Sequence, residues 1–171
     1  MRSGGNLASL TLDVGCGKDK QCKIGVDYDR NSDADIIADA LHLPFKEDVF
    51  RVVLSSYVIE HSLNAFMFLQ EQNRILKKDG LLYCFTDNPE YYGWSVLGLK
   101  GQKHQFLEHD HFAIFYPENI IRMLKILGLN VIYLHYIRIK RMIDCIVRIV
   151  IFFRIFRKEA LFKRYMVVAK K

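Results

Sequence analysis

The sequence predicts an α/β domain built on a seven-stranded, mostly parallel sheet. Short apolar runs typical of buried strands recur along the chain, and helical or loop segments separate them. The chain has 171 residues, the length of one domain, and its 51% hydrophobic content with only 3 prolines suits a folded core. We therefore expect a single domain over residues 1–171.

Seven segments have the composition of buried strands. They are residues 9–14, 23–27, 36–38, 51–55, 81–86, 130–136 and 165–169. A long insert separates the last two segments, and the chain ends on the seventh. We expect that last strand to pair antiparallel with the sixth.

Two segments have helical spacing. Residues 62–78 begin at Ser62, a residue that caps helices well, and Gly80 follows their end. The second helix has Pro117 in its first turn and stops at Gly128. Between the first two strands, "GKDKQCK" is too short for a crossover helix with its connections, so we expect a loop or a single helical turn there.

Acidic residues and glycines gather where the first three strands end. The turn after the first strand contains Asp13, Gly15 and Gly17, and such a turn lets backbone approach a ligand closely. Asp27 ends the second strand, where a carboxylate can accept hydrogen bonds from a ribose diol, and Asp39 follows the third. Each glycine or aspartate alone also fits an ordinary turn, but together the residues favour a nucleotide-type site.

These motifs carry a family resemblance. "LDVGCG", "IGVD", "ADALHLPF" and "SSYVIEH", followed by "ILKKDGLL", resemble the successive motifs of class I S-adenosylmethionine-dependent methyltransferases. The likeness covers roughly residues 10–135. Within that superfamily the chain is similar to a small group with a shortened first crossover, often associated with surface-polysaccharide biosynthesis. The resemblance implies a Rossmann-like sheet with an antiparallel last strand, S-adenosylmethionine as cofactor, and methyl transfer as the activity.

The resemblance also assigns the cofactor site. It implies that the methionine end lies at the glycine turn, the ribose at Asp27, and the adenine at Asp39. The full set of expected cofactor residues is Asp13, Gly15, Cys16, Gly17, Asp27, Tyr28, Asp39, Ala40, Leu41, Ser55 and Tyr57.

The candidate catalytic residues follow the fourth strand. Glu60 and His61 are placed to line a cleft there, and a histidine can act as a base near neutral pH. The alternative is that Glu60 anchors backbone and His61 only packs. His111 is a third candidate, from the segment "KHQFLEHDHF".

That histidine-rich segment and the aromatic stretch before it are candidates for the acceptor site. Tyr91, Tyr92, Trp94 and His109 are the expected substrate contacts, with core packing as the alternative for the aromatic residues. His104, Glu108, His109, Asp110 and His111 have the composition of a metal cluster, but a loop before the next helix is the simpler interpretation. We expect no metal.

Residues 137–164 form a basic insert. On a helical wheel, basic residues between Lys140 and Lys158 fall on one side, and apolar residues from Met142 to Phe156 fall on the other. The segment is too short and too charged to span a bilayer comfortably. Three uses stay open: contact with an anionic membrane surface, docking on a partner, or covering the protein's own sheet.

Charge and cysteine content narrow the function. A net charge of +6 suits an anionic partner, but "SSYVIEH" lacks the Asn/Asp-Pro-Pro-aromatic turn of enzymes that methylate base nitrogens, which disfavours nucleic acid. The 4 cysteines show no disulfide or zinc spacing, and no secretory signal is apparent, so we expect a cytoplasmic protein that can also lie at a membrane surface.

The leading hypothesis is a methyltransferase for a small-molecule, sugar or lipid-linked acceptor. The alternatives are a scaffold without transfer activity that acts through the basic helix and, below it, an RNA methyltransferase.

Overall fold

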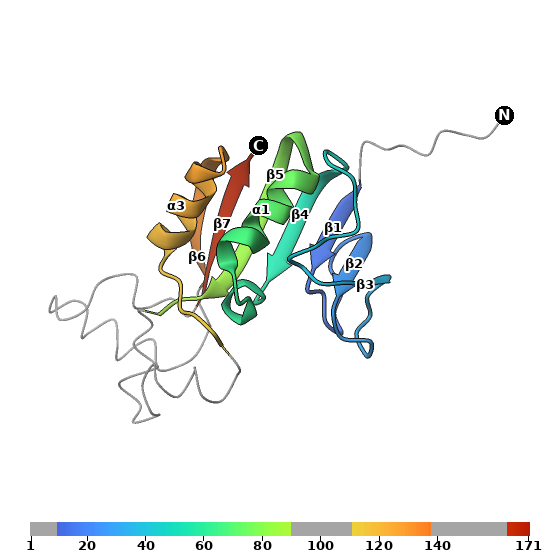
Figure 1. Ribbon diagram of the computed structural model, residues 1–171. Coiled ribbons are helices and arrows are strands. Elements are labelled where there is room, and N and C mark those ends of the chain that lie inside the picture. The colour runs from blue at the N-terminus through green and yellow to red at the C-terminus, as the bar shows by residue number, and fades with distance from the viewer. Residues whose placement is uncertain (1–9, 90–110, 138–163) are drawn as a thin grey trace, which may run out of the picture.

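The computed structural model describes residues 10–89, 111–137 and 164–171, which form one seven-stranded sheet with helices packed on it (Figure 1). The strands lie in the order β3-β2-β1-β4-β5-β7-β6. Their bounds are β1 Thr11–Val14, β2 Ile24–Asp27, β3 Ile36–Ile37, β4 Phe50–Ser56, β5 Leu76–Asp87, β6 Asn130–Ile137 and β7 Arg164–Lys170. All seven predicted strands are therefore present.

The sheet has the predicted mixed topology. Neighbours among β1 to β5 pair parallel, and β7 pairs antiparallel with both β5 and β6. The carboxyl ends of the parallel strands therefore share one edge, and β7 begins at that edge because it runs the other way. No helix lies between β1 and β2, as predicted.

Three helical elements are described, and one of them corrects the sequence prediction. They are the short 3-10 helix η2 (Ile59–His61) and the α-helices α1 (Ala65–Ile75) and α3 (Pro117–Ile126). The bounds of α3 agree with the expected start at Pro117 and stop before Gly128. The prediction of a helix over residues 62–78 was wrong at both ends.

Local contacts explain the corrected bounds of α1. The cap is Asn64, whose side-chain oxygen accepts the Met67 N–H at 3.1 Å, and Ser62 lies outside the helix. At the other end, Leu76 is fully buried and pairs with Phe50, so β5 begins there. Lys77 and Lys78, which the predicted bounds placed in the helix, belong to this strand.

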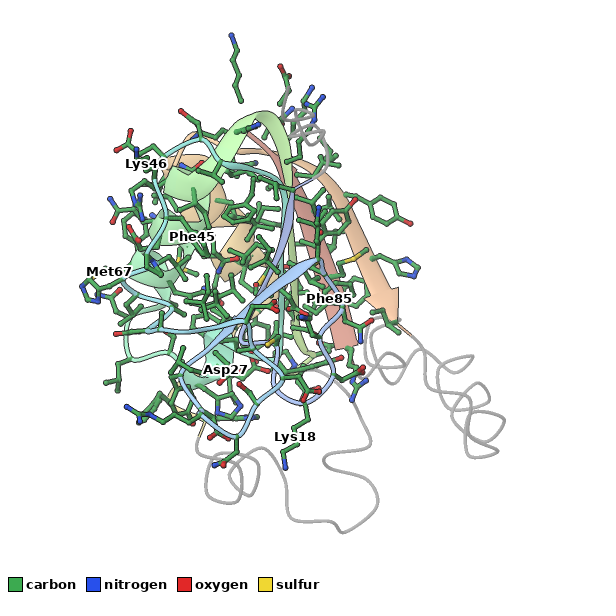
Figure 2. The ribbon with its side chains drawn as sticks, turned by 90° about the vertical axis from the view of Figure 1, so that its right-hand side faces the viewer. Lys18, Asp27, Phe45, Lys46, Met67 and Phe85 are labelled. Atoms are coloured by element: carbon green, nitrogen blue, oxygen red, sulfur yellow. The ribbon has the colours of Figure 1, made fainter. Side chains whose placement is uncertain are left out.

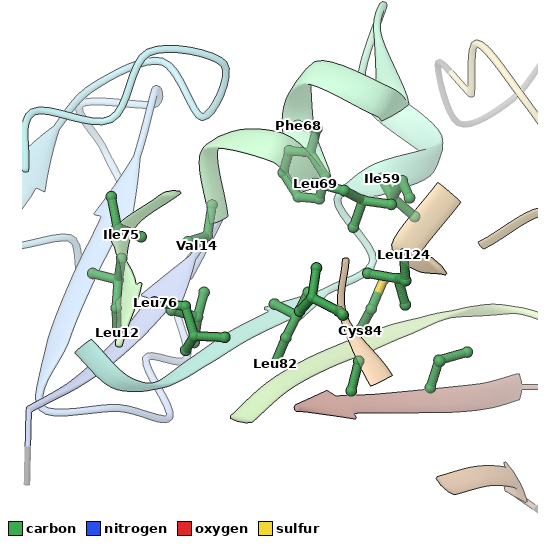
Figure 3. Close-up of a cluster of buried hydrophobic side chains, with 14 of the residues drawn as sticks. Leu12, Val14, Ile59, Phe68, Leu69, Ile75, Leu76, Leu82, Cys84 and Leu124 are labelled. Carbon is green, nitrogen blue, oxygen red and sulfur yellow. The ribbon is translucent and has the colours of Figure 1, made fainter. Parts of the chain in front are cut away.

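The core lies on one side of the sheet. Leu12, Val14, Leu82 and Cys84 point from the strands toward Phe68, Leu69 and Leu124 of the helices, as Figure 3 shows. Because α1, α3 and the β3–β4 connection all pack into this one cluster, the buried side chains position the carboxyl edge of the sheet as a rigid unit.

Candidate functional site

The turn after β1 has the backbone conformation that glycine permits. Gly15 and Gly17 have φ values of 72° and 54°, in the left-handed region that side chains rarely adopt. At Gly15 a Cβ atom would also lie 2.3 Å from Cγ2 of Val58, in the segment after β4. The turn therefore needs glycine at position 15 for both conformation and space.

Hydrogen bonds hold this turn against β2. The Gly15 and Cys16 N–H groups donate to the Val26 carbonyl at 2.7 and 3.2 Å, and the Gly17 N–H donates to Asp27 Oδ2 at 2.8 Å. Three backbone donors are thus already used inside the protein. A ligand at this turn would meet carbonyl oxygens, which suit a positively charged amino group better than a carboxylate.

Asp13 and Asp27 are both buried beside the turn. Asp13 accepts the Gln21 N–H at 2.7 Å, and its burial raises the pKa of its carboxyl. Asp27 accepts from Gly17 and, through Oδ1, from the Asp29 N–H at 2.9 Å. Each carboxylate oxygen can accept a second hydrogen bond, so both groups keep capacity for a ligand.

Asp39 and its neighbours form the adjoining turn after β3. The Ala38 N–H donates to the Asp27 carbonyl at 2.9 Å, which joins this segment to β2. Asp39 is exposed, and its Oδ1 accepts the Leu41 N–H at 2.8 Å. Ala40 and Leu41 are half-buried beside it, whereas Tyr28 is 84% exposed.

The segment after β4 closes the other side of the turn. Ser55 is buried, and Tyr57 has a left-handed φ of 59°, which is rare for a bulky residue and occurs most often at functional sites. Its N–H donates to the Phe85 carbonyl at 3.1 Å. Burial raises the pKa of Tyr57 to about 12, so its phenol keeps its proton and can act as a donor.

Glu60 is the most unusual acidic group of this edge. It is only 4% exposed, and burial raises the pKa of its carboxyl to about 7, although Thr86 donates a hydrogen bond to it. Its Oε2 atom has no hydrogen-bond partner among the described residues. A carboxyl that titrates near neutral pH can exchange a proton with a substrate.

The other two candidate catalytic residues lie together near Glu60. The rings of His61 and His111 are 4.6 Å apart between centroids and nearly perpendicular. The Glu60 carbonyl accepts the Phe112 N–H at 2.8 Å, which ties the segment after His111 to η2. The structure thus brings the three residues to one place, as both the cleft and the packing interpretations require.

Several predicted residues lie outside the described part of the chain. They are Tyr91, Tyr92, Trp94, His104, Glu108, His109 and Asp110, together with the basic insert from Lys140 to Lys158. Among the described residues, no three metal-ligating side chains gather at one point. None of the described helices is long and apolar enough to cross a membrane.

Three contributors to this edge were missed from the sequence. Val58 packs over Gly15, Thr86 donates to Glu60, and the Arg164 guanidinium lies 4.5 Å from the centroid of the Tyr57 ring. Arg164 is also 3.9 Å from the Asp87 carboxylate. Only their positions in the sequence could have indicated them. Val58 follows β4, Thr86 lies near the end of β5, and Arg164 begins β7.

The site's chemistry fits S-adenosylmethionine. Carbonyl groups and Asp13 can accept from the ammonium group, Asp27 from the ribose hydroxyls, and Asp39 from the exocyclic amine of adenine. The absence of a Cβ at Gly15 keeps the turn close to the segment after β4. These groups follow one another along the carboxyl edge of β1, β2 and β3.

Comparisons with known proteins agree with this fit. Residues 12–84 match the family described as Methyltransferase domain. An uncharacterized protein of Methanocaldococcus jannaschii is 30% identical over 131 residues, which cover 70% of this chain and 62% of that protein. A ubiquinone biosynthesis O-methyltransferase of Ruegeria pomeroyi is 28% identical over 131 residues, 74% of this chain and 50% of the enzyme. The chain thus spans about half to three fifths of the length of these two relatives.

Solved structures show the same fold. A SAM-dependent methyltransferase from Archaeoglobus fulgidus superposes with a TM-score of 0.70 at 18% identity, covering 95% of this chain and 86% of that one. An S-adenosylmethionine-dependent methyltransferase from Mesorhizobium loti gives a TM-score of 0.67 at 16% identity, covering 95% and 90%. The predicted resemblance is confirmed: the chain contains a class I methyltransferase domain with the Rossmann-like fold, and the cofactor of such a domain is S-adenosylmethionine.

Proposed function

We propose that the protein transfers a methyl group from S-adenosylmethionine to a hydroxyl of a small-molecule, sugar or lipid-linked acceptor. The observation that carries this proposal is the hydrogen bond between the glycine turn and Asp27, the carboxylate assigned to the ribose hydroxyls. The Gly17 N–H donates to Asp27 at 2.8 Å. This bond presents backbone carbonyls and a buried acid at one edge of the sheet. The methyltransferase match over residues 12–84 includes both residues.

The proposed roles follow from what each group can donate or accept. When bound, the cofactor supplies a methyl group on a sulfonium, which a nucleophile displaces in line, so the protein mainly positions and stabilises. Asp13 holds the methionine end of the bound molecule, Asp27 its ribose and Asp39 its adenine, and Val58 packs against the turn at Gly15. Glu60 receives the proton of the acceptor hydroxyl, since its pKa of about 7 suits a base at neutral pH.

Two observations support an oxygen acceptor. Glu60 is a buried carboxyl with a spare oxygen near the carboxyl edge of β4, where a hydroxyl proton needs an acceptor. The named relative from Ruegeria pomeroyi is an O-methyltransferase of ubiquinone biosynthesis. Contact of the segment from Lys140 to Lys158 with a membrane surface was one of three uses left open by the sequence, and that segment lies outside the described residues.

A methyl-transfer assay with three proteins tests the proposal. Labelled S-adenosylmethionine is incubated with phenolic, sugar and lipid-linked hydroxyl acceptors and with wild type, Glu60→Gln, or the control Glu47→Gln, which changes an exposed glutamate. We expect transfer by wild type and Glu47→Gln, and a loss of about 100-fold or more for Glu60→Gln at unchanged cofactor affinity. Full activity of Glu60→Gln would refute its role as base. Cofactor binding without transfer to any hydroxyl acceptor would favour the non-catalytic scaffold.

A further inference from the structure

The second face of the sheet carries an apolar surface that lies outside the core. Along β4, β5 and β7 the side chains alternate, and Val53, Leu82 and Val167 belong to the core on the helix side. Their neighbours Leu54, Tyr83 and Val168 point the other way. Figure 2 shows the two sides, with Met67 of α1 on one side and Phe85 on the other.

The strand register makes this surface continuous. Leu54 pairs with Tyr83, Tyr83 with Val168, and Val168 with Tyr133. A second row joins Phe85 to Met166. We call these six residues the rear apolar face: Leu54, Tyr83, Phe85, Tyr133, Met166 and Val168. None of them is part of the hydrophobic cluster under α1 and α3.

Little of the described chain covers this face. The short β1–β2 connection lies at one end of it, since Cys16 and Lys20 lie where a Cβ of Gly25 would be. Of the six residues, Tyr133 is 52% exposed and Val168 only 4%, and the other four are half-buried. Of the helices in the described ranges, α1 and α3 both pack on the opposite side. An apolar sheet face of this extent needs a partner to exclude water.

We propose that residues 138–163 of the same chain pack on the rear apolar face. The segment leaves the sheet after Ile137 and returns at Arg164, and these two residues are directly paired. Ile137 lies two positions after His135, and Arg164 two positions before Met166, the partner of His135. Residues two apart on a strand point to the same side of the sheet, so this pair is on the side of the rear apolar face. The two ends of the segment therefore stand at the margin of the surface that it would cover.

The sequence of the segment fits that place. At helical spacing, Met142, Ile146, Ile149, Val150, Phe153 and Phe156 share one side, and basic residues share the other. A helix of about 15 residues spans about 22 Å, and the distance from β4 to β6 across three strand spacings is about 14 Å. With its apolar side against the sheet and its basic side toward solvent, the segment would remove both its own apolar residues and the rear apolar face from water.

The other long segment outside the described residues has a different exit. Residues 90–110 return at His111, whose ring contacts His61, and the following Phe112 is bonded to Glu60. That end is tied to η2, which leads into α1 on the core side. Residues 138–163 are therefore the better-placed occupant.

Photo-crosslinking tests the proposal directly. A benzophenone amino acid replaces Tyr83 on the rear apolar face or, as the control, the partly exposed Met67 on α1. After irradiation of the full chain, we expect position 83 to link to peptides from 138–163 within the same molecule, and position 67 not to link to them. Links from position 83 between two chains would show that a second copy covers the face and would overturn the proposal, as would links that avoid 138–163.

A pair of neighbouring substitutions gives an independent test. We expect Ile149→Asp, on the apolar side, to lower the thermal midpoint of the domain by about 5 °C or more, and Arg148→Asp, on the basic side, to leave it unchanged. The alternative occupant is a membrane. Saturable binding to phosphatidylglycerol vesicles that Ile149→Asp abolishes, with no change in thermal midpoint, would overturn the proposal.

Discussion

Among the described residues at the carboxyl edge of the sheet, Glu60 is the carboxyl group whose environment departs most from that of an ordinary glutamate. Its carboxyl is buried, its pKa is raised from 4.5 to about 7, and the protonated form is therefore favoured by folding. The folded state binds this proton more strongly than the unfolded state. The stabilisation that Glu60 provides is complete below pH 4.5 and is lost as pH rises through about 7.

This environment predicts a measurable pH dependence of stability. We expect the free energy of unfolding of wild type to fall between pH 4.5 and pH 7, and Glu60 alone to account for up to about 3 kcal/mol of that fall. In Glu60→Gln this part of the dependence should disappear, because the amide does not titrate. Urea unfolding of both proteins across this range measures the difference. Parallel curves for the two proteins would show that the Glu60 pKa is not raised.

At the scale of elements, the turn after β1 is the critical connection. We expect Gly15→Ala to abolish cofactor binding and to destabilise the domain, because the new Cβ would lie 2.3 Å from Val58 in a backbone with φ of 72°. Gly17→Ala is the matched control: it has the same type of strain, φ of 54°, but no atom within 4 Å of the new Cβ. It should cost only about 1 kcal/mol. Equal effects of the two changes would contradict the close contact with Val58.

The start of α1 gives a second prediction at this scale. Asn64→Ala should lower the free energy of unfolding by about 1 kcal/mol, since it removes the side-chain acceptor for the Met67 N–H. Ser62→Ala should cost less, because Ser62 lies outside the helix and only accepts the Asn64 N–H at 3.3 Å. Thermal or urea unfolding of the two variants decides which residue caps the helix. A larger loss for Ser62→Ala would restore the bounds predicted from sequence.

Elements were predictable from the sequence where the signals were local. The short gap between Gly17 and Lys23 left room only for a loop or a single helical turn, and the spacing after Pro117 indicated α3. The end of α1 was not predictable, because "ILKKDG" has good helix formers and its strand conformation depends on distant partners. Leu76 pairs with Phe50, and Asp79 forms an ion pair of 2.8 Å with Lys170 at the end of β7. Such long-range contacts override local propensity.

At the scale of the whole molecule, the site was predictable only where each group ends a strand. Parallel pairing brings Asp13, Asp27 and Asp39 to one edge, so the aspartates were recognisable from their positions alone. Arg164 came to the same edge through the antiparallel last strand, and no local pattern marks it. The same topology leaves the rear apolar face without a described helix. Cofactor site, candidate base and rear apolar face thus all follow from one strand order.

The central claim is that the edge formed by β1, β2 and β3 binds S-adenosylmethionine. Calorimetric titration of wild type, Asp27→Asn and the exposed control Asp33→Asn with S-adenosylmethionine and its demethylated product tests it most directly. We expect saturable binding of both ligands to wild type and to Asp33→Asn. For Asp27→Asn we expect affinity lower by about 10-fold to 100-fold, because the amide cannot accept from Gly17, Asp29 and the ribose together. No binding to well-folded wild type, or full affinity in Asp27→Asn, would contradict the account.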